Sequence, residues 1–150
     1  VLTTIIVAMA TLAGIEAFSE SQRQSAIDHM TQRALEIATD IQEYARRPAI
    51  LRRENKTAGS GDNKDLVVGF SELSHYDVES DGTGGQDYAG EVATYSLNGH
   101  NSLPSGYNAD ACPDNSPINT VNAYSSEHAV SVCVSITGKS AEDLQVGVAQ

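Results

Sequence analysis

The chain begins with fifteen residues that contain no charged side chain, and this run predicts a helix that is buried on all sides. Residues 1–15 read VLTTIIVAMATLAGI, which is apolar around nearly the whole circumference of a helix. Counted to Phe18, the run reaches the short end of the roughly 17 to 25 residues that span a bilayer. A lipid bilayer or neighbouring helices would cover such a surface.

After Phe18 the pattern changes to that of a helix with one packed face. Apolar residues recur at spacings of three and four, and charged residues occupy the other faces. Pro48 is expected to end the helix near Arg47, so one helix over residues 1–47 would be about 70 Å long at about 1.5 Å per residue. The apolar stripe consists of Ile27, Met30, Ala34, Ile37, Ile41 and Tyr44.

Beyond a polar, glycine-bearing segment at residues 52–63, short stretches with strand-like patterns alternate with turn signals. In the clearest stretch, valine and isoleucine alternate with serine and cysteine from residue 130 to 136, and we expect the valine face to pack on the helix stripe. Residues 144–148 repeat the alternation after a Gly-Lys-Ser turn, which predicts a C-terminal antiparallel hairpin. The predicted strands cover residues 66–70, 73–79, 91–97, 119–125, 128–137 and 144–149.

These elements predict an α+β protein in which a long N-terminal helix packs on a small antiparallel sheet. Its 150 residues are the usual size of one domain. We expect residues 1–53 to form the helical stem and the start of a linker, and residues 54–150 to form the β-rich globular head. Residues 98–117, rich in Asn, Pro, Ser and Gly, are expected to form a long loop.

The net charge of −11 lies entirely in the predicted head. Residues 1–53 contain six acidic and six basic side chains, whereas residues 54–150 contain fourteen acidic side chains and only three lysines. A head this acidic repels phosphate backbones and anionic lipid surfaces. No nucleic-acid partner is therefore expected, and the head should be soluble in water.

Cys112 and Cys133 are the two cysteines of the chain, so they are the candidates for one disulfide. An exported chain would oxidise them, and the alternative is two free, buried thiols in a cytosolic protein. The apolar run favours export. It starts at the first residue without the basic region of a secretory signal peptide and leads into more helix, as expected of a chain already processed at its front.

Glu16 is the one acidic residue among the first eighteen. A carboxylate inside an apolar bundle is costly unless it is paired, and the amine of a neighbouring subunit or Arg23 would be a suitable partner. The alternative is that Glu16 lies beside water at the edge of the apolar region. It is therefore a candidate assembly residue.

Asp77, Glu79 and Asp81, followed by Gly82, are similar to the start of an oxygen-rich calcium loop. At the twelfth position, where such a loop has an acidic residue, this chain has Tyr88. The alternative is the wet face of a strand that leads into an Asp-Gly turn. Calcium is the one cofactor that the sequence suggests, and otherwise none is expected.

Other chemistry finds little support in the sequence. Asn55 begins an Asn-Lys-Thr tripeptide that fits the N-glycosylation pattern in the predicted linker. The four histidines show no close spacing to one another, to the cysteines or to a serine elbow, and no glycine-rich phosphate loop opens a helix. The chain is therefore not expected to be an enzyme.

The overall layout resembles that of the type IV pilins and the related secretion pseudopilins. In that family an apolar helix starts the mature chain, becomes amphipathic about halfway, and is followed by a small sheet with a cysteine pair near the C-terminus. Gly14 falls where helices of that family commonly carry a glycine. Cys112 and Cys133 are similar to the pair that bounds the family's C-terminal loop.

The chain departs from the family pattern at three positions of the helix. The family usually starts with an aromatic residue and has a glutamate at the fifth mature position, whereas this chain has Val1 and Ile5. Gln22 stands near the place where many bacterial pilins have a helix-bending proline. The chain is thus a divergent member by resemblance, without the glutamate that neutralises a neighbour's N-terminal amine.

The resemblance implies a structural subunit of an extracellular helical filament, in which the apolar helices are buried against one another. Val1, Gly14 and Glu16 would be its assembly residues. Its partners would be copies of itself, the inner membrane before assembly, and the pilus assembly machinery. Two alternatives remain, a membrane-anchored extracytoplasmic binding module and a minor pseudopilin of a secretion system.

Overall fold

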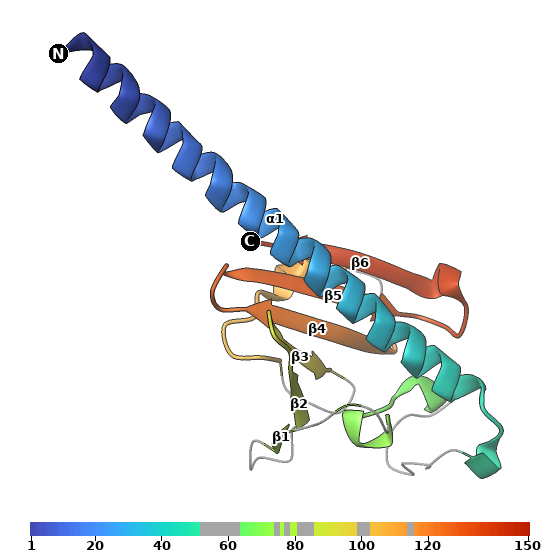
Figure 1. The fold of residues 1–150 in the computed structure, drawn as a ribbon. Coiled ribbons are helices and arrows are strands. Elements are labelled where there is room, and N and C mark those ends of the chain that lie inside the picture. The colour runs from blue at the N-terminus through green and yellow to red at the C-terminus, as the bar shows by residue number, and fades with distance from the viewer. Residues whose placement is uncertain (52–63, 74–75, 77–78, 81–85, 99–102, 114–115) are drawn as a thin grey trace.

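The computed structural model contains one long helix that lies across an antiparallel sheet (Figure 1). It describes residues 1–51, 64–73, 76, 79–80, 86–98, 103–113 and 116–150. Within these ranges the six strands pair in chain order, each antiparallel to the next, which confirms the expected α+β fold. The strands are β1 (Glu79–Ser80), β2 (Gln86–Ala89), β3 (Thr94–Leu97), β4 (Asn119–Ser125), β5 (Val130–Ile136) and β6 (Leu144–Ala149).

The helix α1 (Leu2–Arg46) is continuous over 45 residues. It ends where the sequence predicts, because Arg47 precedes a proline and takes the extended conformation that such a position favours, with φ −64° and ψ 148°. In Figure 1 the second half of α1 crosses one face of the sheet, and the first half projects beyond it. The helix therefore belongs to the head along only part of its length.

The apolar stripe of α1 packs on the valine face of β5, as the sequence predicts. Met30, Ala34, Ile37 and Ile41 are fully buried and belong to the same core cluster as the valines of β4 and β5. Burial of a methionine, isoleucine or valine side chain contributes about 1.5–3 kcal/mol. The stripe and the valine face are thus the main source of stability for the head. The buried side chains from the sheet are Val121, Val130, Val132, Val134 and Ile136.

Four of the six predicted strands exist close to their predicted bounds, and two predictions need correction. Residues 66–70 form no strand, although Leu66, Val68 and Phe70 are buried. Instead, the amide of Asn119 donates to the carbonyl oxygens of Leu66, at 2.9 Å, and of Val68, at 3.4 Å. The Asn119 side chain thus takes the place of a neighbouring strand as hydrogen-bond donor. The alternating apolar residues are buried without the backbone hydrogen bonds of a sheet. Of the predicted strand at residues 73–79, only Glu79 lies in a strand among the described residues. The strand β2 at Gln86–Ala89 was not predicted from the sequence.

The sheet is buried on its second face as well, because residues 103–113 lie over β5 and β6. Ser131 and Ser135, on the face of β5 opposite the valines, are almost fully buried. The backbone N–H of Asn108 donates to the Ser131 hydroxyl at 2.9 Å. The segment predicted as a long loop therefore forms a covering layer, and it contains a short 3-10 turn at Ala109–Ala111.

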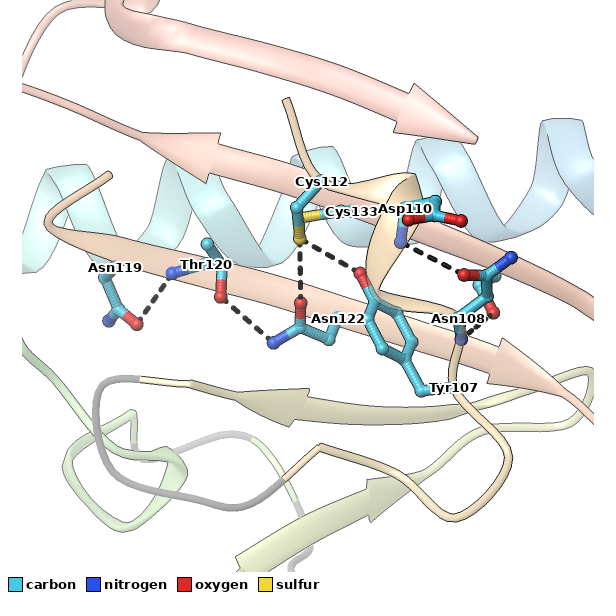
Figure 2. The surroundings of a disulfide bond; sticks show 9 residues. Tyr107, Asn108, Asp110, Cys112, Asn119, Thr120, Asn122 and Cys133 are labelled. Atoms are coloured by element: carbon cyan, nitrogen blue, oxygen red, sulfur yellow. Dashed lines mark hydrogen bonds between the residues drawn. A yellow bond between two sulfur atoms is a disulfide. The ribbon is translucent and has the colours of Figure 1, made fainter. Parts of the chain in front are cut away.

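The disulfide between Cys112 and Cys133 ties this covering layer to β5, which confirms the predicted pair (Figure 2). The Tyr107 hydroxyl lies 3.1 Å from the Cys112 sulfur. Since both sulfurs are bonded to each other and carry no hydrogen, the hydroxyl is the donor. On the neighbouring strand, Asn122 donates to the Thr120 hydroxyl at 3.0 Å, so these two polar side chains of the covered face bond to each other.

An aromatic cluster fixes β2 and β3 against α1. The Tyr88 ring lies 5.2 Å from that of Tyr76 and 5.9 Å from that of Tyr95, measured between centroids. The Arg33 guanidinium lies 5.3 Å from the Tyr88 ring centre and donates to the Tyr88 hydroxyl at 2.8 Å. The hydrogen bonds to Tyr88 and then to Glu36 raise the pKa of Arg33. This part of the sheet is thus held by rings and one guanidinium.

Replacing Gly147 with alanine is expected to destabilise the fold by about 1–3 kcal/mol, the usual cost of overpacking. A Cβ at this position of β6 would lie 1.9 Å from the carbonyl oxygen of Ala111, so the covering layer would have to move. Urea unfolding of the oxidised protein measures the change. The matched control is Gly14→Ala, where nothing lies within 4 Å of the added Cβ. Equal stability of both variants would show that the layer is not packed this closely.

Replacing both Cys112 and Cys133 with alanine is expected to lower the free energy of unfolding by about 3 kcal/mol in the chain-entropy model. The bond spans a sequence separation of 21 and restricts the unfolded chain. Denaturant unfolding of the oxidised and reduced wild-type protein should show the same loss. Thiol titration of the unfolded, unreduced protein should find no free thiol, and two reactive thiols would contradict the bond.

Candidate assembly surface

The first half of α1 has no cover from the rest of the chain. Every residue from 1 to 22 is exposed, and the large apolar side chains in this region are between 49% and 100% exposed. Soluble monomers rarely expose contiguous apolar patches larger than a few hundred Å², and here nine large apolar side chains are exposed on one helix. This surface therefore calls for a partner or a membrane. Its large apolar residues are Val1, Leu2, Ile5, Ile6, Val7, Met9, Leu12, Ile15 and Phe18.

By length and composition, this helix could cross a membrane. Its most apolar 18-residue window has a mean hydropathy of 1.7 and is 0% buried in the structure. A core helix of a soluble protein can be as apolar, but it would be buried within its own chain. A signal sequence near an N-terminus has the same properties, so the helix by itself supports anchoring only weakly.

Two threonines in the apolar half turn their hydroxyls back onto the helix backbone. The Thr4 hydroxyl donates to the carbonyl oxygen of Val1 at 2.8 Å, and the Thr11 hydroxyl donates to that of Val7 at 2.7 Å. In an apolar environment a hydroxyl without such a bond would be costly. These threonines therefore present mainly their methyl groups to whatever covers the helix.

Gly14 has no structural task within a single chain. Nothing lies within 4 Å of the position where its Cβ would be, although glycine inside a helix costs about 1 kcal/mol relative to alanine. Ala10, Ala13 and Ala17 lie on neighbouring turns, so this part of the helix has a small cross-section. Small residues at such spacings allow two helices to approach closely in an apolar medium.

Glu16 is exposed on α1, four residues before Glu20. Among the described residues no ion pair of Glu16 is found, and the Arg23 guanidinium lies 4.0 Å from the Glu20 carboxylate instead. Arg23 also donates to the Gln150 side chain at 3.5 Å, which places the C-terminus beside the helix (Figure 1). Val1 is fully exposed at the free end of α1. The assembly roles of Val1, Gly14 and Glu16 remain predictions.

The other candidate sites lie largely outside the described residues. Asn55, Asp77 and Asp81 are not among them, and Glu79 is the first residue of β1, paired in register with Asp87. Within the described ranges, no group of three or more His, Cys, Asp or Glu side chains is placed to hold a metal ion. The calcium loop and the glycan therefore stay predictions from the sequence.

Two adjacent cavities flank α1 on the β2 and β3 side of the head, and both are lined in part by His29. One, of about 350 Å³, is lined by Arg33, Glu36, Tyr88 and Tyr95 among others. Two of its charged groups are bonded to each other, because Arg33 donates to Glu36 at 2.7 Å. Burial raises the pKa of Tyr95 to about 12, so its phenol stays neutral at neutral pH.

The second cavity, of about 300 Å³, lies nearer the stem. It has apolar side chains from Ala26 and Val92, and polar ones from Glu127 and His128 in the turn between β4 and β5. Sequence reasoning did not find either cavity, because their walls come from α1, β2, β3 and a turn that are far apart in the chain. No local sequence pattern predicts that these distant segments pack side by side.

No protein family, no curated protein and no solved structure matches this chain. What stands is the architecture, which combines a long N-terminal apolar helix, a small antiparallel sheet and one disulfide. That combination is compatible with a pilin-like protein. It leaves the role of the uncovered half of α1 as the central question.

The full chain is expected to partition into the detergent phase of a cloud-point separation, and a fragment starting at Gln24 into the aqueous phase. The fragment keeps every buried residue of α1, the first of which is Ala26, and loses the uncovered apolar side chains. Circular dichroism and the intact disulfide provide the control for folding of the fragment. Detergent partition of a folded fragment would mean that the head carries the apolar surface.

Proposed function

We propose that this protein is a structural subunit of an extracellular, type IV pilus-like helical filament, assembled by burial of the apolar half of α1 in the filament core. The observation that carries the proposal is the division of one continuous helix. Residues 1–22 are exposed on every side, whereas the stripe from Ile27 to Tyr44 is packed in the head.

The energetics favour association of such stems in water. Burial of each large apolar side chain contributes about 1.5–3 kcal/mol, and the lost freedom of association costs about 4–15 kcal/mol. Full burial of the nine large apolar residues of the stem would contribute about 14–27 kcal/mol at these values, which exceeds all but the top of that range of cost. Rods that associate side by side with a constant axial offset make heterologous contacts, which continue into an open helical filament.

Before assembly the same surface would hold each subunit in the inner membrane, with the acidic head on the outer side. Pilus assembly machinery would then move subunits from the membrane into the filament. Gly14 is proposed to allow close approach of neighbouring stems, and Glu16 to pair with the Val1 amine of a neighbouring subunit. Since no nucleic acid or enzyme chemistry enters this scheme, the partners are the membrane, the machinery and further copies.

A second candidate function is a membrane-anchored extracytoplasmic binding module. The observation that favours it is the pair of cavities beside α1, about 350 and 300 Å³ in volume. In that case the stem would cross the bilayer as a single span and the head would stay monomeric. Electron microscopy of negatively stained protein after detergent removal separates the two functions, because only the first gives long uniform fibres.

Replacing Leu12 with lysine is expected to abolish fibres, because a charge would enter the apolar contact between stems. The matched control is Leu103→Lys, the same change at a head residue that is 39% exposed. Fibres are counted by negative-stain imaging and pelleted by sedimentation. Fibres from Leu12→Lys that match the wild type in length and yield would contradict assembly through the stem.

A further inference from the structure

Outside residues 1–22, the uncovered part of the stem, the most exposed large apolar side chains of the described residues lie directly after α1. Ile50 is 95% exposed and Leu51 is 68% exposed, on a 3-10 turn at Ala49–Leu51. The next such residues in the head, Val148 and Val146, are 43% and 41% exposed. This apolar turn stands at the end of the head that is far from the stem (Figure 1).

In the sequence, the apolar turn lies between two pairs of arginines. Four of the nine basic residues of the chain lie between positions 46 and 53. Arg46 is turned back onto the head, where its Nε donates to the carbonyl oxygen of Lys139 at 2.9 Å. Arg47 is 49% exposed, lies beside the Tyr44 ring and is 3.6 Å from the Glu43 carboxylate. Because exposed ion pairs of this kind contribute little, an acid of a partner can replace Glu43.

The opposite end of the head has a complementary feature, the cavity of about 300 Å³ described above. Ala26 and Val92 provide apolar lining, and Glu127 is an exposed acid in the same lining. An apolar projection beside Arg47 thus corresponds to a hollow whose lining combines Ala26 and Val92 with polar side chains that include Glu127. The two features lie at opposite ends of one molecule, so neither can meet the other within a single chain.

We propose that the Ile50–Leu51 turn of one copy of this chain docks into the cavity at Ala26 and Val92 of the next copy, with Arg47 facing Glu127. The proposal rests on the filament function and names the contact that sets the axial offset between its heads. Burial of the two apolar side chains supplies the attraction, and the charge pair selects the register.

The geometry of α1 gives the size of this offset. From Ala26 at the cavity to Arg46, where α1 ends, the helix advances 20 residues, or about 30 Å at about 1.5 Å per residue, and the turn lies just beyond. A second copy displaced by slightly more than that length along the helix axis, and sideways so that its stem lies beside the first copy's helix, brings its cavity to the first copy's turn. Because the two surfaces differ, the contact is heterologous and repeats from copy to copy.

The charge distribution explains why such a contact would be selective. Each chain carries a net charge of −11, so most juxtapositions of two heads are repulsive. A contact that places Arg47 against Glu127 replaces repulsion with attraction at one offset. The stems are apolar around the whole helix, so contacts between stems favour no single axial position. The contact between Arg47 and Glu127 would select one.

Charge reversal tests the pair in the full chain. Arg47→Glu and Glu127→Arg are each expected to raise the critical concentration for fibre formation about tenfold, and the double variant is expected to restore it. The matched control combines Arg47→Glu with Glu142→Arg, which has the same net charge but reverses an exposed acid outside the cavity. Restoration by the control as well as by the double variant would mean that net charge alone acts, and the proposed contact would be rejected.

Disulfide trapping gives an independent readout. Fibres of the Leu51→Cys, Val92→Cys variant should yield a ladder of covalent multimers on mild oxidation, whereas Leu51→Cys alone should yield no multimer. Dimers from the single variant would show that two turns meet each other, which overturns the heterologous contact. Wild-type fibres combined with no ladder would reject this inference alone. If the wild-type chain forms no fibres, the filament function and this inference both fail.

Discussion

The packing of the helix stripe on the valine face of β5 is the interaction on which the rest of the molecule depends. Met30, Ala34, Ile37 and Ile41 are fully buried there, so this half of α1 is rigidly attached to the head. Because the helix has no proline before residue 48, the rigidity extends into the uncovered half. The head thus presents an apolar rod in a defined direction, which an assembly partner or a membrane can accept.

The rest of the head compensates for its small size by covering both faces of the sheet. A sheet with one buried face would leave the serines of β5 in water, but the layer at residues 103–113 lies over them and is held by the disulfide. Gly147 permits the close approach, because any side chain there would collide with the carbonyl of Ala111. The aromatic cluster around Arg33 then attaches the short strands β2 and β3. The disulfide, the close contact at Gly147 and the aromatic cluster all stabilise the head and make no contact with residues 1–22.

Two opposing forces act between neighbouring copies in any assembly of these chains. The stems attract one another through apolar surface, whereas the heads repel through their net charge of −11. Four of the nine basic residues fall at positions 46–53 of the sequence, which also contain the exposed Ile50 and Leu51. The apolar stem would then drive assembly, and the charged and apolar groups of the head would set the orientation of neighbouring subunits.

The sequence by itself determined the features that are local and periodic. The charge-free first fifteen residues, the stripe from Ile27 to Tyr44, the end of the helix before Pro48 and the strands at 119–125 and 144–149 all follow from spacing and turn chemistry. The tertiary structure alone decided what depends on residues distant in the chain. Asn119 holds residues 66–68 without a strand, and the two cavities arise where α1 meets β2, β3 and the turn at Glu127. The residues that form such hydrogen bonds and cavities do not recur at regular spacings in the sequence, so no periodic pattern can predict them.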